Sequence, residues 1–126
     1  MVHTAVRQRP LAEGAVVTKA TLRAASTLGL SNKVLARILG LSEASVSRMG
    51  SGTFLLTARD KSFELAILFL RLFRSLDAIV AGDEVASRAW LQHEHATLGD
   101  APGVLIQSLP GLVNVVGYLD ARRALI

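Results

Sequence analysis

The chain has 126 residues, of which 51% are hydrophobic, and its formal net charge is +4. This length allows one ordinary core, or two small helical lobes that share one, and it excludes two large independent domains. The chain contains no cysteine, which excludes disulfides, thiolate metal sites and cysteine nucleophiles and is consistent with a cytoplasmic location.

The positive charge is concentrated in the first half of the chain, because eight of the fourteen Lys and Arg residues precede residue 60. A basic half favours a polyanionic partner such as DNA. The longest apolar run, Leu65 to Leu70, is far shorter than the ~20 residues that cross a bilayer, so we expect no membrane partner. The many apolar residues are therefore expected to be covered in part by another protein.

Helical patterns predict an all-α fold. The opening residues, 1–17, lack the apolar stretch of a secretory signal and are expected to form a flexible arm. Thr18 then caps a helix that runs to about Leu28 and stops at Gly29. Two short helices follow: Ser31 caps one that ends at Gly40, and Ser42 caps one that is expected to close at Gly50.

The second half continues with helices after a connector, "GSGTFLLT". The longest helix is expected from about Asp60 to Ala81. It carries one apolar stripe of Phe63, Ile67, Leu70 and Phe73, and another of Leu65, Leu68, Leu72, Leu76 and Ile79. We expect one stripe to line the core and the other to be a homo-oligomer contact. Three further helices are predicted, over residues 83–92, from Pro102 to about Gln107, and from the Ser108 cap onward.

The stretch "LARILGLSEASVSRM" has the outline of a DNA-reading helix-turn-helix. A small residue, Ala36, allows close helix crossing, Gly40 makes the turn, and Val46 holds the two helices together. Hydroxyls and an arginine on the outer face suit a DNA groove. The residues expected to face DNA are Asn32, Lys33, Ser42, Ala44, Ser45, Ser47 and Arg48. An ordinary helical hairpin would explain the caps and glycines equally well.

The segment "LGLSNKVLARILGLSEASVSRM" resembles the Xre/Cro-type helix-turn-helix, and "AWLQHEHATLGDAPGVLIQSLPGLVNVVGYLDA" resembles the toxin-binding domain of the Xre/MbcA/ParS antitoxins. The second resemblance rests on a tryptophan anchor, a leucine-glycine pair, a proline-started short helix and a valine-rich last helix. In this chain these features are Trp90, Leu98 with Gly99, Pro102, and Val115 with Val116.

The resemblance implies an antitoxin, not an enzyme. Its expected partners are a cognate RES-domain toxin that destroys NAD, operator DNA, and further copies of itself, with no cofactor. The implied layout is an N-terminal arm over 1–17, a helix-turn-helix region over 18–59, a long connecting or oligomerisation helix over 60–82, and a toxin-binding lobe over 83–126. The toxin-binding residues are expected to be Trp90, Pro102, Tyr118, Arg122, Arg123, Ala124, Leu125 and Ile126.

Several residues allow other interpretations. His93 and His95 form an H-x-H pair, but the sequence places no third ligand beside them, so no metal is expected. Trp90 is either a core or interface anchor or a stacking surface for a base. The arginines at 122 and 123 are either a solvated helix end or a plug for an anionic pocket. A stand-alone dimeric transcription factor and a polar-localisation adaptor remain as rival functions.

Overall fold

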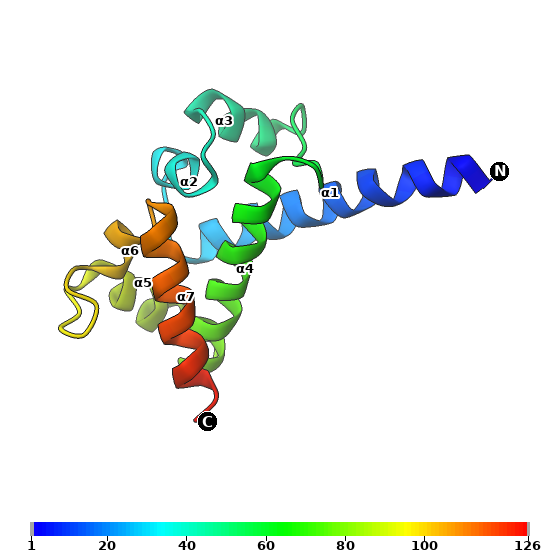
Figure 1. Ribbon diagram of the computed structural model, residues 1–126. Helices are drawn as coiled ribbons and strands as arrows, with labels where there is room; N and C mark the ends of the chain where they lie inside the picture. The colour runs from blue at the N-terminus through cyan, green and yellow to red at the C-terminus, as the bar shows by residue number, and fades with distance from the viewer. Residues whose placement is uncertain (1, 126) are drawn as a thin grey trace.

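The computed structural model describes residues 2–125, and the side chains of residues 12–125 (Figure 1). All regular secondary structure in this part of the chain is helical, which confirms the all-α prediction. The helices are α1 (Val2–Thr27), α2 (Asn32–Leu39), α3 (Glu43–Ser51), α4 (Lys61–Ile79), α5 (Glu84–Gln92), α6 (Pro102–Leu105) and α7 (Leu109–Arg123). None of them is both long and apolar enough to cross a membrane.

The predicted serine caps are confirmed, whereas the predicted cap at Thr18 is not. The hydroxyl oxygens of Ser31, Ser42 and Ser108 accept hydrogen bonds from backbone N–H groups in the first turns of α2, α3 and α7. Asp83 does the same for α5 through the N–H of Ala86, at 3.1 Å. Each cap satisfies one N–H group that would otherwise lack a partner at the helix start.

Two predicted helix boundaries are wrong. Residues 2–17 are helical rather than a separate arm, so the first helix begins at Val2 and Thr18 lies inside it. The third helix continues through Gly50 and is closed by Gly52, whose φ of 81° places it in the left-handed region that glycine adopts without strain.

Helix α4 lies at the centre of the molecule and packs against α1, α2 and α7 (Figure 1). Its core face contains Ala66, Phe69 and Leu72, each 0% exposed. Ala66 and Phe69 belong to neither of the two predicted stripes, because α4 is buried on more than one side. From the first stripe, Ile67 remains 44% exposed, and from the second, Leu72 and Leu76 are buried in the core.

Contacts between distant segments hold α1 against the connector that follows α3. The Thr18 hydroxyl, which is buried, donates to the Gly14 carbonyl at 2.6 Å and accepts from the Leu56 N–H at 2.9 Å. At Gly14, the backbone of α1 approaches the Leu56 carbonyl so closely that a Cβ would collide with it. Leu56 itself is 1% exposed. The sequence therefore needs a glycine and a threonine one helical turn apart on this face of α1.

Polar side chains join the N-terminal helices to the C-terminal ones. Arg88 of α5 donates to the carbonyl oxygens of Thr27, at 2.9 Å, and Ser26, at 3.1 Å. These carbonyls belong to the last turn of α1, where the N–H groups four residues later do not bond to them, although the Ser26 carbonyl also accepts from the Gly29 N–H at 3.1 Å. Arg37 of α2 donates to Gln107, at 3.2 Å. The N-terminal and C-terminal helices are thus connected by these two arginines as well as through α4.

Candidate functional site

Helices α2 and α3 form the predicted helix-turn-helix. Ala36 is 3% exposed and Val46 is 1% exposed, so both lie inside the helix pair and its contact with the core. Gly40 ends α2 with a φ of 67°, and its N–H donates to the Ala36 carbonyl. This left-handed turn lets α3 begin three residues later and pack against α2.

The outer face of α3 carries a continuous chain of hydrogen bonds. The Ser42 hydroxyl donates to the Ser45 hydroxyl oxygen at 3.0 Å, and Arg48 Nη2 donates to the same oxygen at 3.1 Å. Arg48 is exposed, and Ser45 is half-buried. The guanidinium is therefore held along the helix surface with most of its donors still available to a ligand.

The remaining residues predicted to face DNA are also on the surface. Asn32 and Lys33 are exposed in the first turn of α2, and Ala44 and Ser47 are exposed on α3. Their contact with DNA stays a prediction.

Two hydroxyls near the end of α3 were not in the predicted set. Ser51 and Thr53 are exposed, their hydroxyls lie 3.1 Å apart, and each donates to the Arg48 carbonyl, at 3.2 and 3.4 Å. Sequence reasoning misses these two hydroxyls because it assigns residues 50–52, "GSG", to the start of a connector.

The C-terminal helices bring three aromatic rings together. Trp90 of α5 and Tyr118 of α7 stack with their centroids 6.3 Å apart and an interplanar angle of 17°. His95, from the loop after α5, lies edge-on to both, at 5.8 Å from Trp90 and 4.9 Å from Tyr118. We call these three residues the aromatic cluster. All are half-buried, so the cluster both packs inward and presents surface.

His95 also fixes the loop between α5 and α6. Its ring Nε2 lies 3.2 Å from the Tyr118 hydroxyl. Its backbone N–H donates to the Asp100 carbonyl, and its backbone carbonyl accepts from the Gly99 N–H at 2.8 Å. His93 instead has its Nδ1 2.7 Å from the Ala89 carbonyl oxygen. The two histidines therefore contact different partners. Sequence reasoning weighed His95 only as a metal ligand and missed this structural role.

Pro102 is buried in the first turn of α6, and its contact with a toxin stays a prediction. At Gly111, near the start of α7, a Cβ would collide with the Leu105 carbonyl. This close approach positions α6 against α7.

The end of α7 is exposed. Arg122 and Arg123 lie in its last turn, Ala124 follows as the C-terminal cap residue, and Leu125 is 80% exposed. Ile126 lies outside the described residues. Arg123 lines a shallow hollow with α4 residues including Ile67 and Arg74. The structure thus brings Trp90 and Tyr118 together. The C-terminus lies at the far end of α7 (Figure 1).

Comparison with protein families gives two matches. The antitoxin Xre-like helix-turn-helix domain matches residues 7–71, which is more than half of the chain, and the antitoxin Xre/MbcA/ParS C-terminal toxin-binding domain matches residues 75–124. A comparison with curated proteins found no match. The first match contains the helix-turn-helix of α2 and α3, and the second contains the aromatic cluster and α7. The chain therefore belongs to the Xre-like antitoxins, with a helix-turn-helix domain followed by an Xre/MbcA/ParS toxin-binding domain.

Proposed function

We propose that this antitoxin neutralises a RES-domain toxin that degrades NAD, by covering the toxin's NAD pocket with its C-terminal region, and that it represses its own operon through the helix-turn-helix. The observation that carries the proposal is the presence of both matched domains on one core, each with an exposed polar or aromatic surface. The RES identity of the toxin rests on the resemblance of the C-terminal segment.

The operator would be read by α3. Its exposed hydroxyls can contact phosphates or base edges, and Arg48 can donate two parallel hydrogen bonds to a guanine. The predicted DNA face has only two basic side chains, Lys33 and Arg48. Tight binding therefore requires two or more copies at spaced half-sites, as in other helix-turn-helix proteins.

The toxin would be contacted by the C-terminal lobe. An NAD pocket accommodates a planar ring and a pyrophosphate, and arginines pair with the polar or acidic groups beside such a ligand. Arg122 and Arg123, followed by the exposed Leu125, provide two charged groups and an apolar end. The aromatic cluster offers a second contact surface on the same lobe. Inhibition by this route is steric and needs no chemistry from the antitoxin.

These proposed roles follow the division that the sequence predicts, except that residues 2–17 are part of α1. We assign DNA reading to the region 18–59, toxin binding to the region 83–126, and the connection between them to the helix within 60–82. Helix α4 is then a connector that also belongs to the core of both lobes.

The decisive experiment mixes the purified chain with the RES-domain protein that we expect the neighbouring reading frame to encode, and follows NAD loss. Full suppression at a stoichiometric ratio, together with a gel shift of the operon's promoter fragment by the same complex, supports the proposal. If the chain shifts the promoter but leaves NAD loss unchanged, it is a stand-alone DNA-binding regulator, and the proposed toxin target is wrong.

A further inference from the structure

One carboxylate joins the last turn of α7 to α4. Asp120 Oδ2 lies 2.6 Å from Arg71 Nη2, and Asp120 Oδ1 accepts a hydrogen bond from the Ser75 hydroxyl at 2.8 Å. Arg71 and Ser75 are four residues apart on α4, so they are neighbours on the same face of that helix. Both oxygens of the carboxylate are therefore bonded to α4. We call these three residues the Asp120 contact.

The two bonds of this contact differ in burial. Ser75 is 0% exposed, so its hydroxyl cannot exchange this partner for water. The Arg71 side chain is 63% exposed and that of Asp120 is 29% exposed, so solvent screens the ion pair and its contribution alone is modest. Among residues 12–125, it is nevertheless the only ion pair that joins two helices. The hydroxyl fixes where the carboxylate lies, and the arginine balances its charge.

Asp120 occupies a position where a helix disfavours a carboxylate. The C-terminal end of an α-helix carries a partial negative charge, which favours Arg122 and Arg123 and opposes Asp120 in the same turn. Aspartate also has a lower helix propensity than most residues. Local helix energetics therefore do not explain an acid at this position, whereas its two partners on α4 do.

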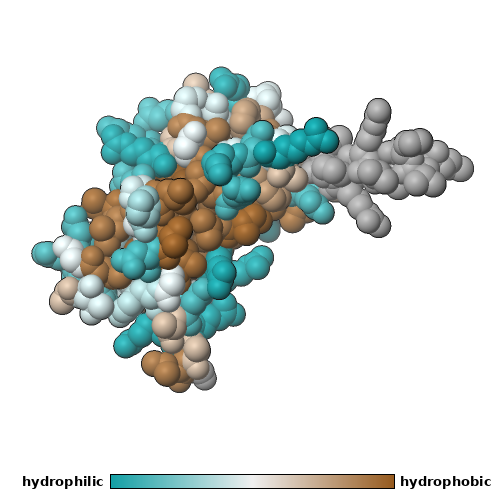
Figure 2. Space-filling view, in the orientation of Figure 1, coloured by the Kyte–Doolittle hydropathy of each residue, from teal (hydrophilic) through white to brown (hydrophobic). Residues whose placement is uncertain are grey.

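The Asp120 contact is the last fixed point before the exposed end of the chain. Leu119 is 1% exposed, and none of the described residues from 120 to 125 is buried. Two arginines follow within three residues, and Leu125 is 80% exposed. The surface shows an apolar tip beside hydrophilic side chains where α7 ends (Figure 2). The direction in which these side chains leave the protein therefore depends on how Asp120 is held.

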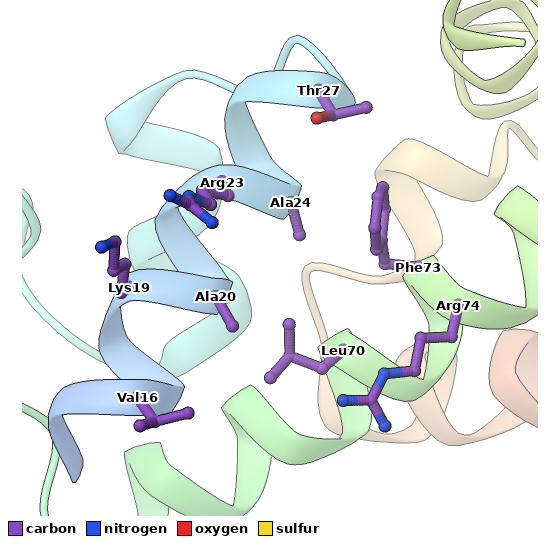
Figure 3. A pocket seen from close by; sticks show the side chains of 9 residues that line it. All are labelled: Val16, Lys19, Ala20, Arg23, Ala24, Thr27, Leu70, Phe73 and Arg74. Atoms are coloured by element: carbon purple, nitrogen blue, oxygen red, sulfur yellow. The ribbon is translucent and has the colours of Figure 1, made fainter. Parts of the chain in front are cut away.

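Asp120 also balances a cluster of positive charge. A shallow hollow of about 250 Å³ is lined by Arg71, Arg74 and Arg123 among others, and the described part of the chain contributes no acidic side chain to it. Leu70 and Arg74 also border the neighbouring hollow between α4 and α1 (Figure 3). Because Asp120 pairs with Arg71, it reduces the repulsion that Arg123 meets beside α4.

We propose that Asp120 is a positioning residue for toxin inhibition: held by Arg71 and Ser75, it fixes the last turn of α7 so that the two arginines of the tail are directed into the toxin's NAD pocket. This inference rests on the proposed role of the tail. Asp120 does not enter the pocket and acts through the turn that follows it. A tail whose base is already fixed loses less conformational freedom on binding, so the contact raises affinity without touching the toxin.

The test measures the antitoxin concentration that halves NAD loss, with the toxin held well below that concentration. Asp120→Asn keeps an oxygen that can accept from Ser75 but removes the charge that pairs with Arg71. It should raise the concentration about threefold to tenfold. Arg71→Met keeps the apolar part of the side chain and should have the same effect. The matched control is Lys61→Met, which breaks the exposed ion pair with Glu64 on the same helix and should change nothing.

The two substitutions remove the same contact, so their effects should not add. The double variant, Arg71→Met with Asp120→Asn, should need no more than about twice the antitoxin that either single variant needs. Asp120→Glu keeps the charge on a longer side chain and should recover part of the inhibition. A general loss of folding would also weaken operator binding, so unchanged operator affinity in all these variants separates positioning from stability.

Hydrogen–deuterium exchange of the free chain tests the fixed turn without toxin. Asp120→Asn and Arg71→Met should each speed amide exchange in the last turn of α7 at least about threefold, and exchange around the buried Val115 should stay unchanged. Unaltered exchange in that turn overturns the inference, as does full inhibition by both variants when the unmodified chain inhibits. An unmodified chain that does not suppress NAD loss is a failure of the proposed function and removes the positioning role with it, whereas the exchange result still shows whether Asp120 fixes the turn.

Discussion

At the scale of single residues, Thr18 shows how one buried hydroxyl determines a long-range contact. It is 3% exposed and serves two backbone groups, donating to Gly14 and accepting from the Leu56 N–H. Thr18→Val preserves the shape but leaves the buried Leu56 N–H without a partner. Urea denaturation should show a loss of about 1 to 3 kcal/mol.

The matched control for this substitution is Thr57→Val. The Thr57 hydroxyl makes a single hydrogen bond, to Asp60 at 2.6 Å, and this bond lies on the surface. Water can replace that bond, so the loss should stay below about 1 kcal/mol. Equal losses from the two substitutions would show that the Thr18 bond adds nothing beyond an exposed one.

Arg48 is the residue whose position most directly favours base reading, because Ser45 holds its guanidinium along the exposed face of α3. Arg48→Ala should weaken binding to the operator by about 1 to 3 kcal/mol if it contacts a base. Arg122→Ala removes the same charge at the far end of the chain and should change operator affinity much less. A gel-shift titration in which both variants bind equally well would remove Arg48 from the site.

At the scale of elements, two glycines within helices should respond in opposite directions to the same substitution. Gly14 of α1 lies against the Leu56 carbonyl, whereas Gly117 of α7 has no neighbouring atom within 4 Å of where a Cβ would lie. Gly117→Ala should stabilise the protein by up to about 1 kcal/mol through helix propensity. Gly14→Ala gains the same propensity but must push α1 away from the connector, so a net loss of about 1 to 3 kcal/mol is expected.

Thermal unfolding of the two alanine variants measures this difference. A stabilised Gly14→Ala variant would mean that α1 and the connector can separate at little cost. In that case the close approach at Gly14 would not determine how α1 is positioned against the connector.

The elements that sequence reasoning placed correctly are those with local signals. The caps at Ser31, Ser42 and Ser108 are each determined by a hydroxyl and a backbone N–H three residues later, and both lie within the same short stretch. The start of α1 has no such signal: Pro10 and Gly14 lower helix propensity where the helix in fact runs. Gly14 is favoured there by its contact with residue 56, which a local pattern cannot reveal.

The candidate site also contains one part that a local sequence pattern predicts and one part that it does not. The face of α3 could be predicted because hydroxyls and Arg48 follow a recognisable helix-turn-helix spacing. His95 could not, because its partners Trp90 and Tyr118 come from two different helices and only the packing of α5 against the α6–α7 pair brings the three rings together. An H-x-H pair in the sequence suggests metal binding before it suggests an aromatic contact.

At the scale of the whole molecule, the two lobes should unfold as one unit. They share one core through α4, and Arg88 and Arg37 join them directly. Trp90 is the only tryptophan in the chain, so its fluorescence reports on the C-terminal lobe, while far-UV circular dichroism reports on all helices. The two urea transitions should coincide. A fluorescence change that precedes the loss of helicity would show that the toxin-binding lobe unfolds independently.

The last prediction concerns the end of the chain, where toxin inhibition should be separable from the other properties. Residues Leu112, Val115, Val116 and Leu119 of α7 are buried in the core, whereas the residues after Asp120 are exposed up to Leu125. Deleting Arg122 to Ile126 should therefore leave folding and operator binding intact while releasing the toxin's NAD consumption, because an arginine-bearing tail would no longer occupy the pocket. Arg122→Ala or Arg123→Ala alone should release part of the toxin's NAD consumption.

If the truncated chain still inhibits fully, the tail is a solvated helix end, whose arginines are favoured by the partial negative charge of the helix C-terminus. The blocking surface must then lie around the aromatic cluster and the loop that His95 fixes to α7.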